Sequence, residues 1–263
     1  MTTATRKEFV RMVSAAAIGA AAAPLAAQGD EQGRISATLV KGRDIFGFKP
    51  PPGKNLVLVD LRDSMKFPSH PEIATANSAD TAKVRERVAA LKAMGLEVVP
   101  LLEFSTVNDD WLGEYERMVC SSVYRRILPE LIGDAFEAFG RPKYVHMGYA
   151  NEGEGFHPKD AEYVLSRTGV LWMRWVKITG DCVKALGARP WAWYDCGWRM
   201  DDFYEHAPKD YVYSNLRPLS AIQRDKRTFR ESMSRLSQAG YSLVPRLAKG
   251  ETFGGKGVMG ELS

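Results

Sequence analysis

Asn55-Leu-Val-Leu-Val-Asp60 and Leu96-Glu-Val-Val-Pro-Leu-Leu-Glu103 are short apolar runs that each end on a carboxylate. Runs of this length and composition predict buried parallel strands. Between them, residues 78–95 predict an amphipathic helix, because their apolar residues fall on one stripe. Gly95 stands where a left-handed C-terminal cap ends a helix. This strand–helix–strand unit indicates the fold class of the chain.

The alternation of strands and helices continues to about residue 250. Further strands are expected at Lys143–Gly148, Pro190–Asp195, Asp210–Asn215 and Tyr241–Pro245, with helices at about 122–139, 160–186 and 224–238. Repeated units of this kind predict an α/β fold, a TIM-type (β/α)8 barrel. The active site of such a barrel lies at the C-terminal ends of its strands.

Two strands of the barrel are less evident. Residues 34–40 offer a first strand, whereas nothing after Gly250 predicts an eighth, because the tail is short and rich in glycine. The barrel is therefore expected to be incomplete at its C-terminal end, to close by oligomerisation, or to come from a truncated gene. A doubly wound open sheet is the alternative, but no Gly-x-Gly-x-x-Gly follows a first strand.

The N-terminal residues differ from the rest of the chain. Basic residues such as Arg6 and Lys7 precede an uncharged run rich in alanine, Met12 to Ala27. This pattern is typical of an export signal and resembles a twin-arginine signal in which Lys7 replaces the second arginine. The run is too short for a spanning helix and is interrupted by Pro24. We expect an exported, periplasmic or extracellular product with no stable membrane insertion after signal removal; a retained anchor and an ordinary N-terminal helix are the alternatives.

Composition agrees with a folded domain behind this signal. The chain has 263 residues, of which 45% are hydrophobic and 26% charged, so one domain or at most two are expected. We interpret residues 1–28 as the signal, 29–54 as a lead-in with the first strand, 55–250 as the barrel and 251–263 as a Gly-rich tail.

Charge and cysteine content exclude several classes of protein. The formal net charge is +4 and basic residues are interleaved with acidic ones, so nucleic acid is not an expected partner. Three widely spaced cysteines exclude a disulfide framework and a Cys-x-x-Cys site. There is no His-x-His, His-Glu-x-x-His or Gly-x-Ser-x-Gly motif. Neither a metal nor another cofactor is therefore expected, and the oligomeric state stays open.

Polar and aromatic side chains follow the predicted strands at their C-terminal ends. In chain order they are Asp60, Asp63, Glu103, Asn151, Glu152, Trp193, Asp195, Trp198 and Asn215. Carboxylates and amides bind sugar hydroxyls, and indole rings pack on the C–H faces of sugars. The predicted mouth of the barrel therefore suits a carbohydrate ligand, although packing in the core is an alternative for the tryptophans.

Five motifs occur in a fixed order: Asp60-Leu-Arg-Asp63 with His70-Pro71-Glu72, Gly95-Leu-Glu-Val-Val-Pro100, His146-Met-Gly148, Trp191-Ala-Trp193-Tyr-Asp195 and Pro208-Lys209-Asp210. Together they resemble the β-hexosaminidase family of glycoside hydrolases, of the family 20 type. The resemblance covers about residues 55–217 and implies a barrel that acts on glycans. The chain is most similar to a branch of exported proteins with twin-arginine signals. These proteins are related to the hexosaminidases but are not true hexosaminidases.

The chain departs from the family where the chemistry lies. In hexosaminidases, a fourth-strand Asp orients the substrate's acetamido group and the adjacent Glu protonates the leaving oxygen; Ala150 and Asn151 occupy those positions here. Neither side chain supplies a proton. The resemblance therefore makes Glu152, one residue further on, the predicted general acid, and it argues against an N-acetylhexosamine substrate. A polar surface loop over residues 148–156 is the alternative.

A glycosidase needs a second carboxylate, and Glu103, Asp195 and Asp63 are the candidates by strand position. Substrate binding is expected from the other polar and aromatic residues of the mouth: Asp63, His146, Asn151, Trp193, Trp198 and Asn215. By the resemblance, His146 also supports the acidic residue beside it, although a hydrogen-bonded core histidine is an alternative. The main competing interpretation of the whole chain is a sugar-binding barrel that has lost catalysis with the Asp-Glu pair.

Overall fold

The structure, a computed structural model, describes residues 34–116, 118–150, 152, 167, 169–195, 197, 203–219 and 226–263. The predicted export signal, Asn151 and Trp198 lie outside these residues. Residues Ile35–Ser263 belong to one unit, which contains all the elements discussed below. No helix in the described ranges is both long and apolar enough to cross a membrane.

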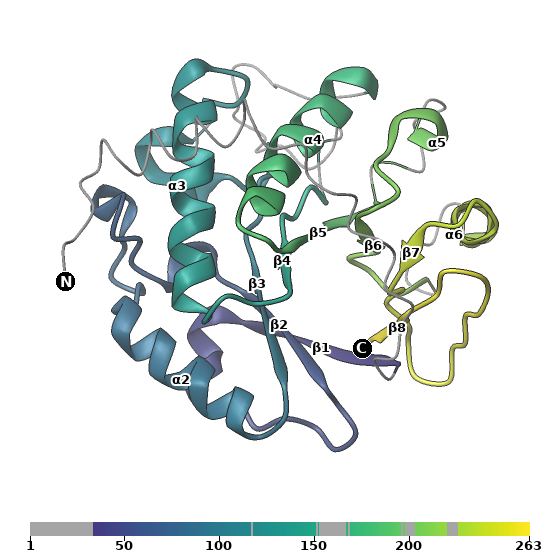
Figure 1. Ribbon diagram of the computed structural model, residues 1–263, viewed down its shortest axis with the longest axis horizontal. Helices are drawn as coiled ribbons and strands as arrows, with labels where there is room; N and C mark the ends of the chain where they lie inside the picture. The colour runs from purple at the N-terminus through teal and green to yellow at the C-terminus, as the bar shows by residue number, and fades with distance from the viewer. Residues whose placement is uncertain are drawn as a thin grey trace. The chain divides into compact units, whose positions relative to one another are not determined.

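Parallel strands make up a barrel (Figure 1). In chain order they are β1 (Ile35–Lys41), β2 (Leu56–Asp60), β3 (Glu97–Leu101), β4 (Tyr144–His146), β5 (Arg189–Trp193), β6 (Val212–Ser214), β7 (Ser242–Leu243) and β8 (Gly260–Leu262). The order across the sheet is β7-β6-β5-β4-β3-β2-β1-β8, and every ladder is parallel. Each strand pairs with the next in the chain and β8 returns to β1, which is the sheet of a TIM-type (β/α)8 barrel and not an open doubly wound sheet.

The eighth strand comes from the Gly-rich tail, where the sequence predicts none. Gly260–Leu262 pairs in parallel with the first residues of β1. The seam to β7 has no continuous ladder, but isolated bridges cross it, with Leu243 N–H donating to the Gly257 carbonyl and Met259 N–H to the Leu243 carbonyl, both at 2.8 Å. The barrel is therefore nearly closed, and its incompleteness is confined to this seam.

Helices and short 3-10 turns connect the strands on the outside of the sheet. They are η1 (Gly42–Phe46), η2 (Arg62–Ser64), η3 (Pro71–Ile73), α2 (Thr81–Ala93), η4 (Asp110–Tyr115), α3 (Ser122–Ala138), α4 (Gly169–Ala185), α5 (Phe203–His206) and α6 (Lys226–Gln238). Two helix ends show the local cause. The Ser121 hydroxyl accepts the Tyr124 N–H at 3.0 Å at the start of α3, and Gly95 has a φ of +85° just after α2.

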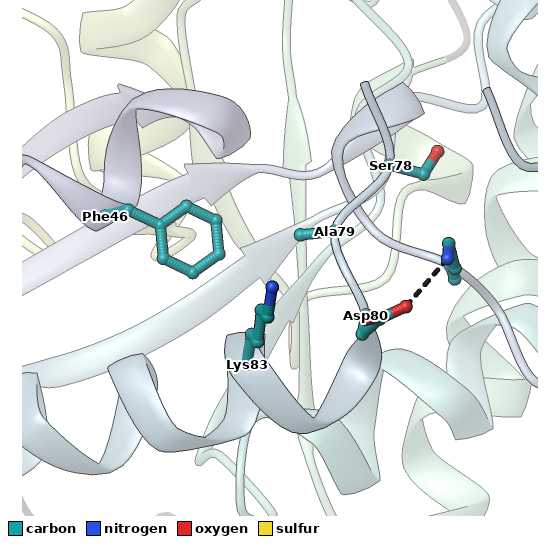
Figure 2. Close-up of a pocket in the computed structure, with 6 residues that line it drawn as sticks. Phe46, Ser78, Ala79, Asp80 and Lys83 are labelled. Carbon is teal, nitrogen blue, oxygen red and sulfur yellow. Dashed lines mark hydrogen bonds and ion pairs between the residues drawn. The ribbon is translucent and has the colours of Figure 1, made fainter. Parts of the chain in front are cut away.

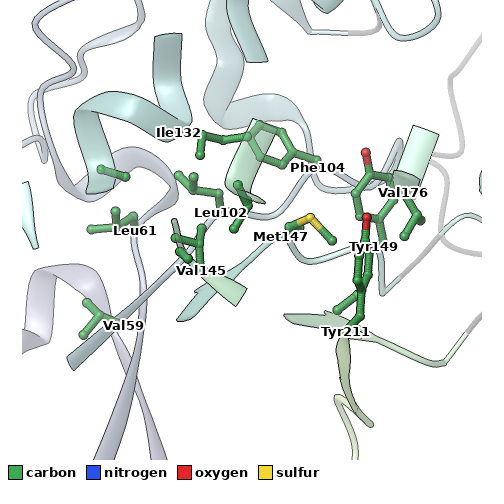
Figure 3. Packing of buried hydrophobic residues seen from close by; sticks show 14 of the residues in the cluster. Val59, Leu61, Leu102, Phe104, Ile132, Val145, Met147, Tyr149, Val176 and Tyr211 are labelled. Carbon is green, nitrogen blue, oxygen red and sulfur yellow. The ribbon is translucent and has the colours of Figure 1, made fainter. Parts of the chain in front are cut away.

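Alternation along the strands produces two cores. On β2, Val57 and Val59 face outward into the large core between sheet and helices, part of which is seen in Figure 3. Leu56 and Leu58 face inward and join the smaller core inside the barrel, together with Trp193. Because side chains alternate with a period of two, the same strands that fill these cores direct their last inward residues into the mouth of the barrel.

Candidate active site

Inward side chains on neighbouring strands lie in layers across the barrel. Leu101 on β3 and His146 on β4 are register partners and share one layer. Two residues further on, Glu103, Gly148 and Trp193 follow in the next layer toward the mouth, where the Trp193 N–H donates to the Gly148 carbonyl at 2.9 Å. Glu103 thus faces a strand position that has no side chain of its own.

The backbone after β4 forms a cradle for the Glu103 carboxylate. Gly148 and Tyr149 both have left-handed φ values, +77° and +71°. As a result the N–H groups of Tyr149 and Ala150 point to the same oxygen, Glu103 Oε1, at 2.8 and 3.4 Å, and Ser105 N–H donates to it at 3.1 Å. Successive N–H groups in left-handed turns make concave sites for anions. A Cβ at Gly148 would overlap the carboxylate and lie 2.6 Å from the Glu103 Cα, so the cradle requires glycine there.

Burial controls the protonation of Glu103. The side chain is 4% exposed. Burial raises its pKa to about 7, the negative charge of Asp60 acts in the same direction, and hydrogen bonds from Ser105 oppose the shift. The Trp111 indole N–H donates to the Glu103 carbonyl at 2.7 Å and fixes the backbone at this point. Glu103 is therefore an oriented carboxyl group that titrates near neutral pH.

Asp195 is a second carboxyl group with a similar pKa. It follows β5, and its Oδ2 accepts the Leu216 N–H at 2.7 Å. Burial raises its pKa to about 7, and backbone hydrogen bonds from Leu216 and Arg217 oppose the shift. Neighbouring Asn215 is buried, and its side chain bonds the Arg246 N–H and carbonyl, both at 2.9 Å. Asn215 therefore joins the chain after β6 to the chain after β7.

His146 lies one layer deeper in the barrel than Glu103, and Trp193 packs against it from the layer of Glu103. Both are fully buried, and their ring centroids are 4.1 Å apart. Burial lowers the pKa of His146 well below its usual range, and its Nδ1 accepts the Gly148 N–H at 3.1 Å, so the ring is neutral with its proton on Nε2. Within the described part of the chain, His146 Nε2 and Trp193 Nε1 have no hydrogen-bond partner. His146 thus accepts a hydrogen bond from the turn that cradles Glu103.

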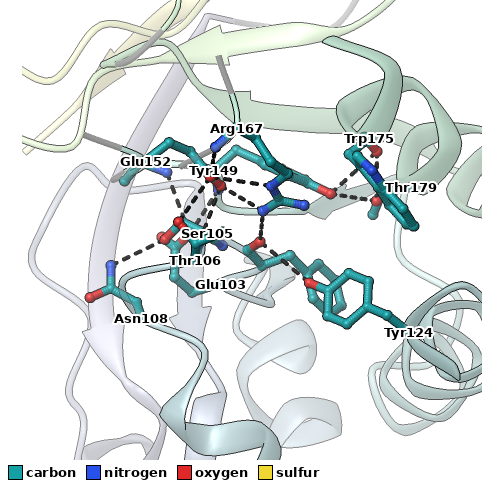
Figure 4. A network of polar contacts seen from close by, with 12 residues as sticks. Glu103, Ser105, Thr106, Asn108, Tyr124, Tyr149, Glu152, Arg167, Trp175 and Thr179 are labelled. Atoms are coloured by element: carbon teal, nitrogen blue, oxygen red, sulfur yellow. Dashed lines mark hydrogen bonds and ion pairs between the residues drawn. The ribbon is translucent and has the colours of Figure 1, made fainter. Parts of the chain in front are cut away.

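Glu152 lies in a buried ion pair (Figure 4). Its Oε1 accepts from Arg167 Nη2 at 2.5 Å, and its Oε2 accepts from Arg167 Nε at 3.2 Å and from the Thr106 hydroxyl at 3.0 Å. Arg167 also donates to the Phe104 carbonyl at 2.6 Å. Both side chains are essentially without solvent exposure. This clamp joins the start of α4 and the chain after β4 to the chain that follows Glu103.

This environment disfavours Glu152 as a general acid. Its two oxygens accept hydrogen bonds from a guanidinium, a hydroxyl and backbone N–H groups. A general acid must present its carboxyl group to the leaving oxygen, whereas both oxygens of Glu152 are held by buried donors on Arg167 and Thr106.

A polar cavity opens at the ends of β1 and β2, with Asp60 in its lining. It has a volume of about 320 Å³, and its walls include Lys41, Arg62, Asp63 and Trp111, so one predicted substrate-binding residue lies on it. We call it the mouth cavity. Arg62 donates to both oxygens of Asp60, at 3.0 and 2.9 Å. Among the described residues, no group of three or more His, Cys, Asp or Glu side chains is placed to hold a metal ion.

Comparisons with known proteins identify the fold. The sequence matches no protein-family model and no curated protein. Among solved structures, the chain is similar to a GH20 exo-β-N-acetylglucosaminidase from Vibrio harveyi in complex with N-acetylglucosamine, with a TM-score of 0.57, 13% identity, and coverage of 83% of this chain and 42% of that one. For Streptomyces plicatus N-acetyl-β-hexosaminidase the TM-score is 0.57 and the identity 14%, with coverage of 81% of this chain and 47% of that one. For Bacteroides fragilis β-N-acetylhexosaminidase the TM-score is 0.58 and the identity 12%, with coverage of 81% of this chain and 50% of that one.

These likenesses show a hexosaminidase-like barrel, as the resemblance in sequence implies. The chain spans about half the length of the structures that it matches. The branch of exported proteins and the roles of individual residues stay predictions.

Three residues of the site carry no clear signal in the sequence. Arg167 lies far from any predicted strand end, and only its ion pair with Glu152 reveals it. Arg62 sits between two predicted site residues, Asp60 and Asp63, and its charge next to them was the available signal. Trp111 belongs to η4, and no periodicity indicates that its indole reaches the Glu103 backbone.

Proposed function

We propose that this protein hydrolyses glycosidic bonds, with Glu103 and Asp195 as its pair of carboxyl groups. The observation that carries the proposal is that Glu103 follows β3 and Asp195 follows β5 at one end of a hexosaminidase-like barrel, and that burial raises both pKa values to about 7. A group with a pKa near the working pH serves as an acid or a base in catalysis. Paired carboxyl groups of this kind are the machinery of glycoside hydrolysis.

Geometry divides the roles between the two groups. The cradle of N–H donors occupies Glu103 Oε1, so the proton of the acid belongs on Oε2, which makes Glu103 the general acid. Asp195 then acts as the general base toward water. Only β4 separates their strands, and strands two places apart in a sheet are about 9 to 10 Å apart. Side chains that point into the barrel approach each other, so the two carboxyl groups are closer together than their strands. Their expected separation is in the range of about 6.5 to 9.5 Å that is typical of inverting enzymes.

The reaction then proceeds by a single displacement. Glu103 donates its proton to the glycosidic oxygen as the bond between that oxygen and the anomeric carbon breaks. Asp195 removes a proton from the water that forms the new bond to the anomeric carbon. Ala150 cannot orient an acetamido group, so the substrate's own acetamido group is not the nucleophile and an N-acetylhexosamine is not required. Asp63, which lines the mouth cavity, binds hydroxyl groups of the glycan.

A sugar-binding barrel without catalysis is the second candidate. The observation that favours it is the burial of Glu152 in its ion pair with Arg167, which withdraws the carboxylate nearest the family's acid position. The two candidates differ in turnover and not in affinity for the glycan.

We also propose that the protein is exported through the signal in residues 1–28 and acts in the periplasm or outside the cell. The pattern of basic residues followed by an alanine-rich run supports this proposal. Replacing Arg6 and Lys7 with glutamine is expected to leave the protein in the cytoplasmic fraction of the cells that express it. Unchanged fractionation of that variant would argue against twin-arginine export.

Hydrolysis tests the enzymatic proposal. The protein is screened against aryl glycosides and oligosaccharides, alongside Glu103→Gln, Asp195→Asn and Glu152→Gln. Glu103→Gln and Asp195→Asn are expected to lower kcat by at least about a hundredfold, the usual contribution of a general acid or base, while ligand affinity persists. Binding without turnover in every protein would establish the sugar-binding candidate. Loss of turnover in Glu152→Gln alone would return the acid role to Glu152.

A further inference from the structure

A second cavity lies outside the barrel mouth, between η1 and the start of α2 (Figure 2). We call it the rim cavity. It has a volume of about 430 Å³, within the range of ligand pockets, and is lined by Phe46, Lys66, Ser78, Ala79, Asp80 and Lys83. Four of these six residues are polar or charged. A cavity of this composition does not suit a purely apolar ligand.

Phe46 supplies an aromatic wall. Its side chain is 43% exposed, although it belongs to a short turn packed directly after β1. Figure 2 shows its ring on one side of the rim cavity, with Ala79, Asp80 and Lys83 on the other. Phe46 is the large apolar side chain of the lining, and an aromatic ring offers a face for the C–H groups of a sugar.

The charges of the rim cavity are unbalanced. Lys66 and Asp80 form an ion pair at 2.7 Å, which neutralises both. Lys83 also lines the cavity and acts electrostatically on the same Asp80, so two ammonium groups share one carboxylate and leave one positive charge in excess. One ammonium group is therefore available to a ligand, and an anionic substituent is the group that it binds most strongly.

The rim cavity adjoins the mouth cavity. Ser64 lines the mouth cavity and Lys66 the rim cavity, so only Met65 separates the two along the chain. Met65 and Ala79 form a parallel bridge, with Lys66 N–H donating to the Ala79 carbonyl and Ala79 N–H to the Ser64 carbonyl, both at 2.9 Å. This bridge therefore lies between the residues that line the two cavities.

We propose that the rim cavity binds a sugar unit with an anionic substituent, such as a carboxylate, in the part of the glycan distant from the scissile bond. Phe46 packs against the ring of that sugar and Lys83 pairs with its anionic group. The inference rests on the proposed function for the position of the scissile bond, and it adds a substrate class: an acidic glycan of several units.

Binding measured by calorimetry tests this proposal without turnover. The protein, Phe46→Ala and Lys83→Gln are titrated with tetragalacturonate and with its methyl ester, which has the same rings and no charge. Lys256→Gln, an exposed lysine on the connection between β7 and β8, is the matched control. The wild type is expected to prefer the acid, Lys83→Gln to lose about tenfold in affinity for the acid alone, and Phe46→Ala to weaken both ligands.

Equal affinity for acid and ester, absence of binding to both, or wild-type binding by Lys83→Gln would overturn the rim cavity as an acidic-sugar site. Hydrolysis of a short aryl glycoside by the same proteins separates this result from the fate of the proposed function. Turnover without charge-dependent binding rejects only the proposal that the rim cavity binds an acidic sugar. Charge-dependent binding without turnover in any protein rejects only the hydrolase.

Discussion

Gly148 occupies a position of the site that tolerates no side chain, because a Cβ there would overlap the Glu103 carboxylate. We expect Gly148→Ala to lower the free energy of unfolding by about 2 kcal/mol or more, since it adds an overlap to the cost of a left-handed alanine. Gly95→Ala is the matched control: its φ is +85° and nothing lies within 4 Å of the added Cβ, so only the backbone cost of about 1 kcal/mol applies. Equal losses in urea unfolding would contradict the cradle.

Glu103 also makes stability depend on pH. Its pKa rises from 4.5 in the unfolded chain to about 7 in the fold, so the folded state binds the extra proton between these values. The contribution of Glu103 to stability is therefore expected to fall as pH rises from about 4.5 to 7, by roughly 3 kcal/mol at most, and Asp195, whose pKa is also raised to about 7, adds a loss in the same direction. Glu103→Gln keeps the hydrogen-bond acceptor but does not titrate. The urea concentration at its unfolding midpoint should therefore fall less than that of the wild type between about pH 4.5 and 7. Parallel curves for the two proteins would contradict the raised pKa.

At the scale of single residues, the sequence predicts where Glu103 and Asp195 lie but not their state. Both follow apolar strands, and that position alone brings them to the mouth. Their raised pKa values depend on burial by segments distant in the chain. The cradle depends on a left-handed conformation at Tyr149. That conformation is uncommon for residues other than glycine, so the sequence does not predict it.

At the scale of elements, the pair Glu152 and Arg167 joins β4 and α4 to the chain after β3. Removing one partner leaves a buried charge, so Arg167→Met is expected to cost about 3 to 5 kcal/mol in urea unfolding. The double variant Arg167→Met with Glu152→Gln should recover part of this loss, because no unpaired charge remains. Additive losses in the double-mutant cycle would show that the two side chains do not act as a pair.

Sequence periodicity predicts elements better than the contacts between them. The helix expected at 122–139 is found at Ser122–Ala138, because its apolar stripe and its capping Ser121 are local signals. The partner of Glu152 has no such signal, since Arg167 is 15 residues away and nothing in the helix expected at residues 160–186 singles it out. Long-range polar pairs of this kind are set by the packing of the barrel.

At the scale of the whole molecule, the short strand β8 closes the barrel. Leu262 is fully buried in the interior core, so Leu262→Ala is expected to cost about 2 to 4 kcal/mol in the free energy of unfolding. Leu171→Ala, at a side chain that is 39% exposed, is the matched control and should change stability by less than about 1 kcal/mol. Similar small losses for both would show that the tail contributes little to the fold.

The number of strands is where sequence analysis fell short of the fold. Seven strands follow from apolar runs, but β8 is only Gly260–Leu262, and no helix precedes it to mark the unit. It is a strand because β1 offers an unpaired edge, with hydrogen bonds such as Ile35 N–H to the Met259 carbonyl at 2.9 Å. Closure of the barrel is thus a property of the assembled sheet.

The central claim is that two carboxyl groups with pKa values near 7 catalyse hydrolysis, and the pH dependence of kcat/KM tests it most directly. We predict a narrow bell with its maximum near pH 7, because Asp195 must be ionised and Glu103 protonated, and the apparent values belong to the pair. In the residual activity of Asp195→Asn, the acidic limb of the pH profile should be absent. In that of Glu103→Gln, the basic limb should be absent. A profile that titrates only near pH 4, or one that keeps both limbs in the two variants, would contradict the account.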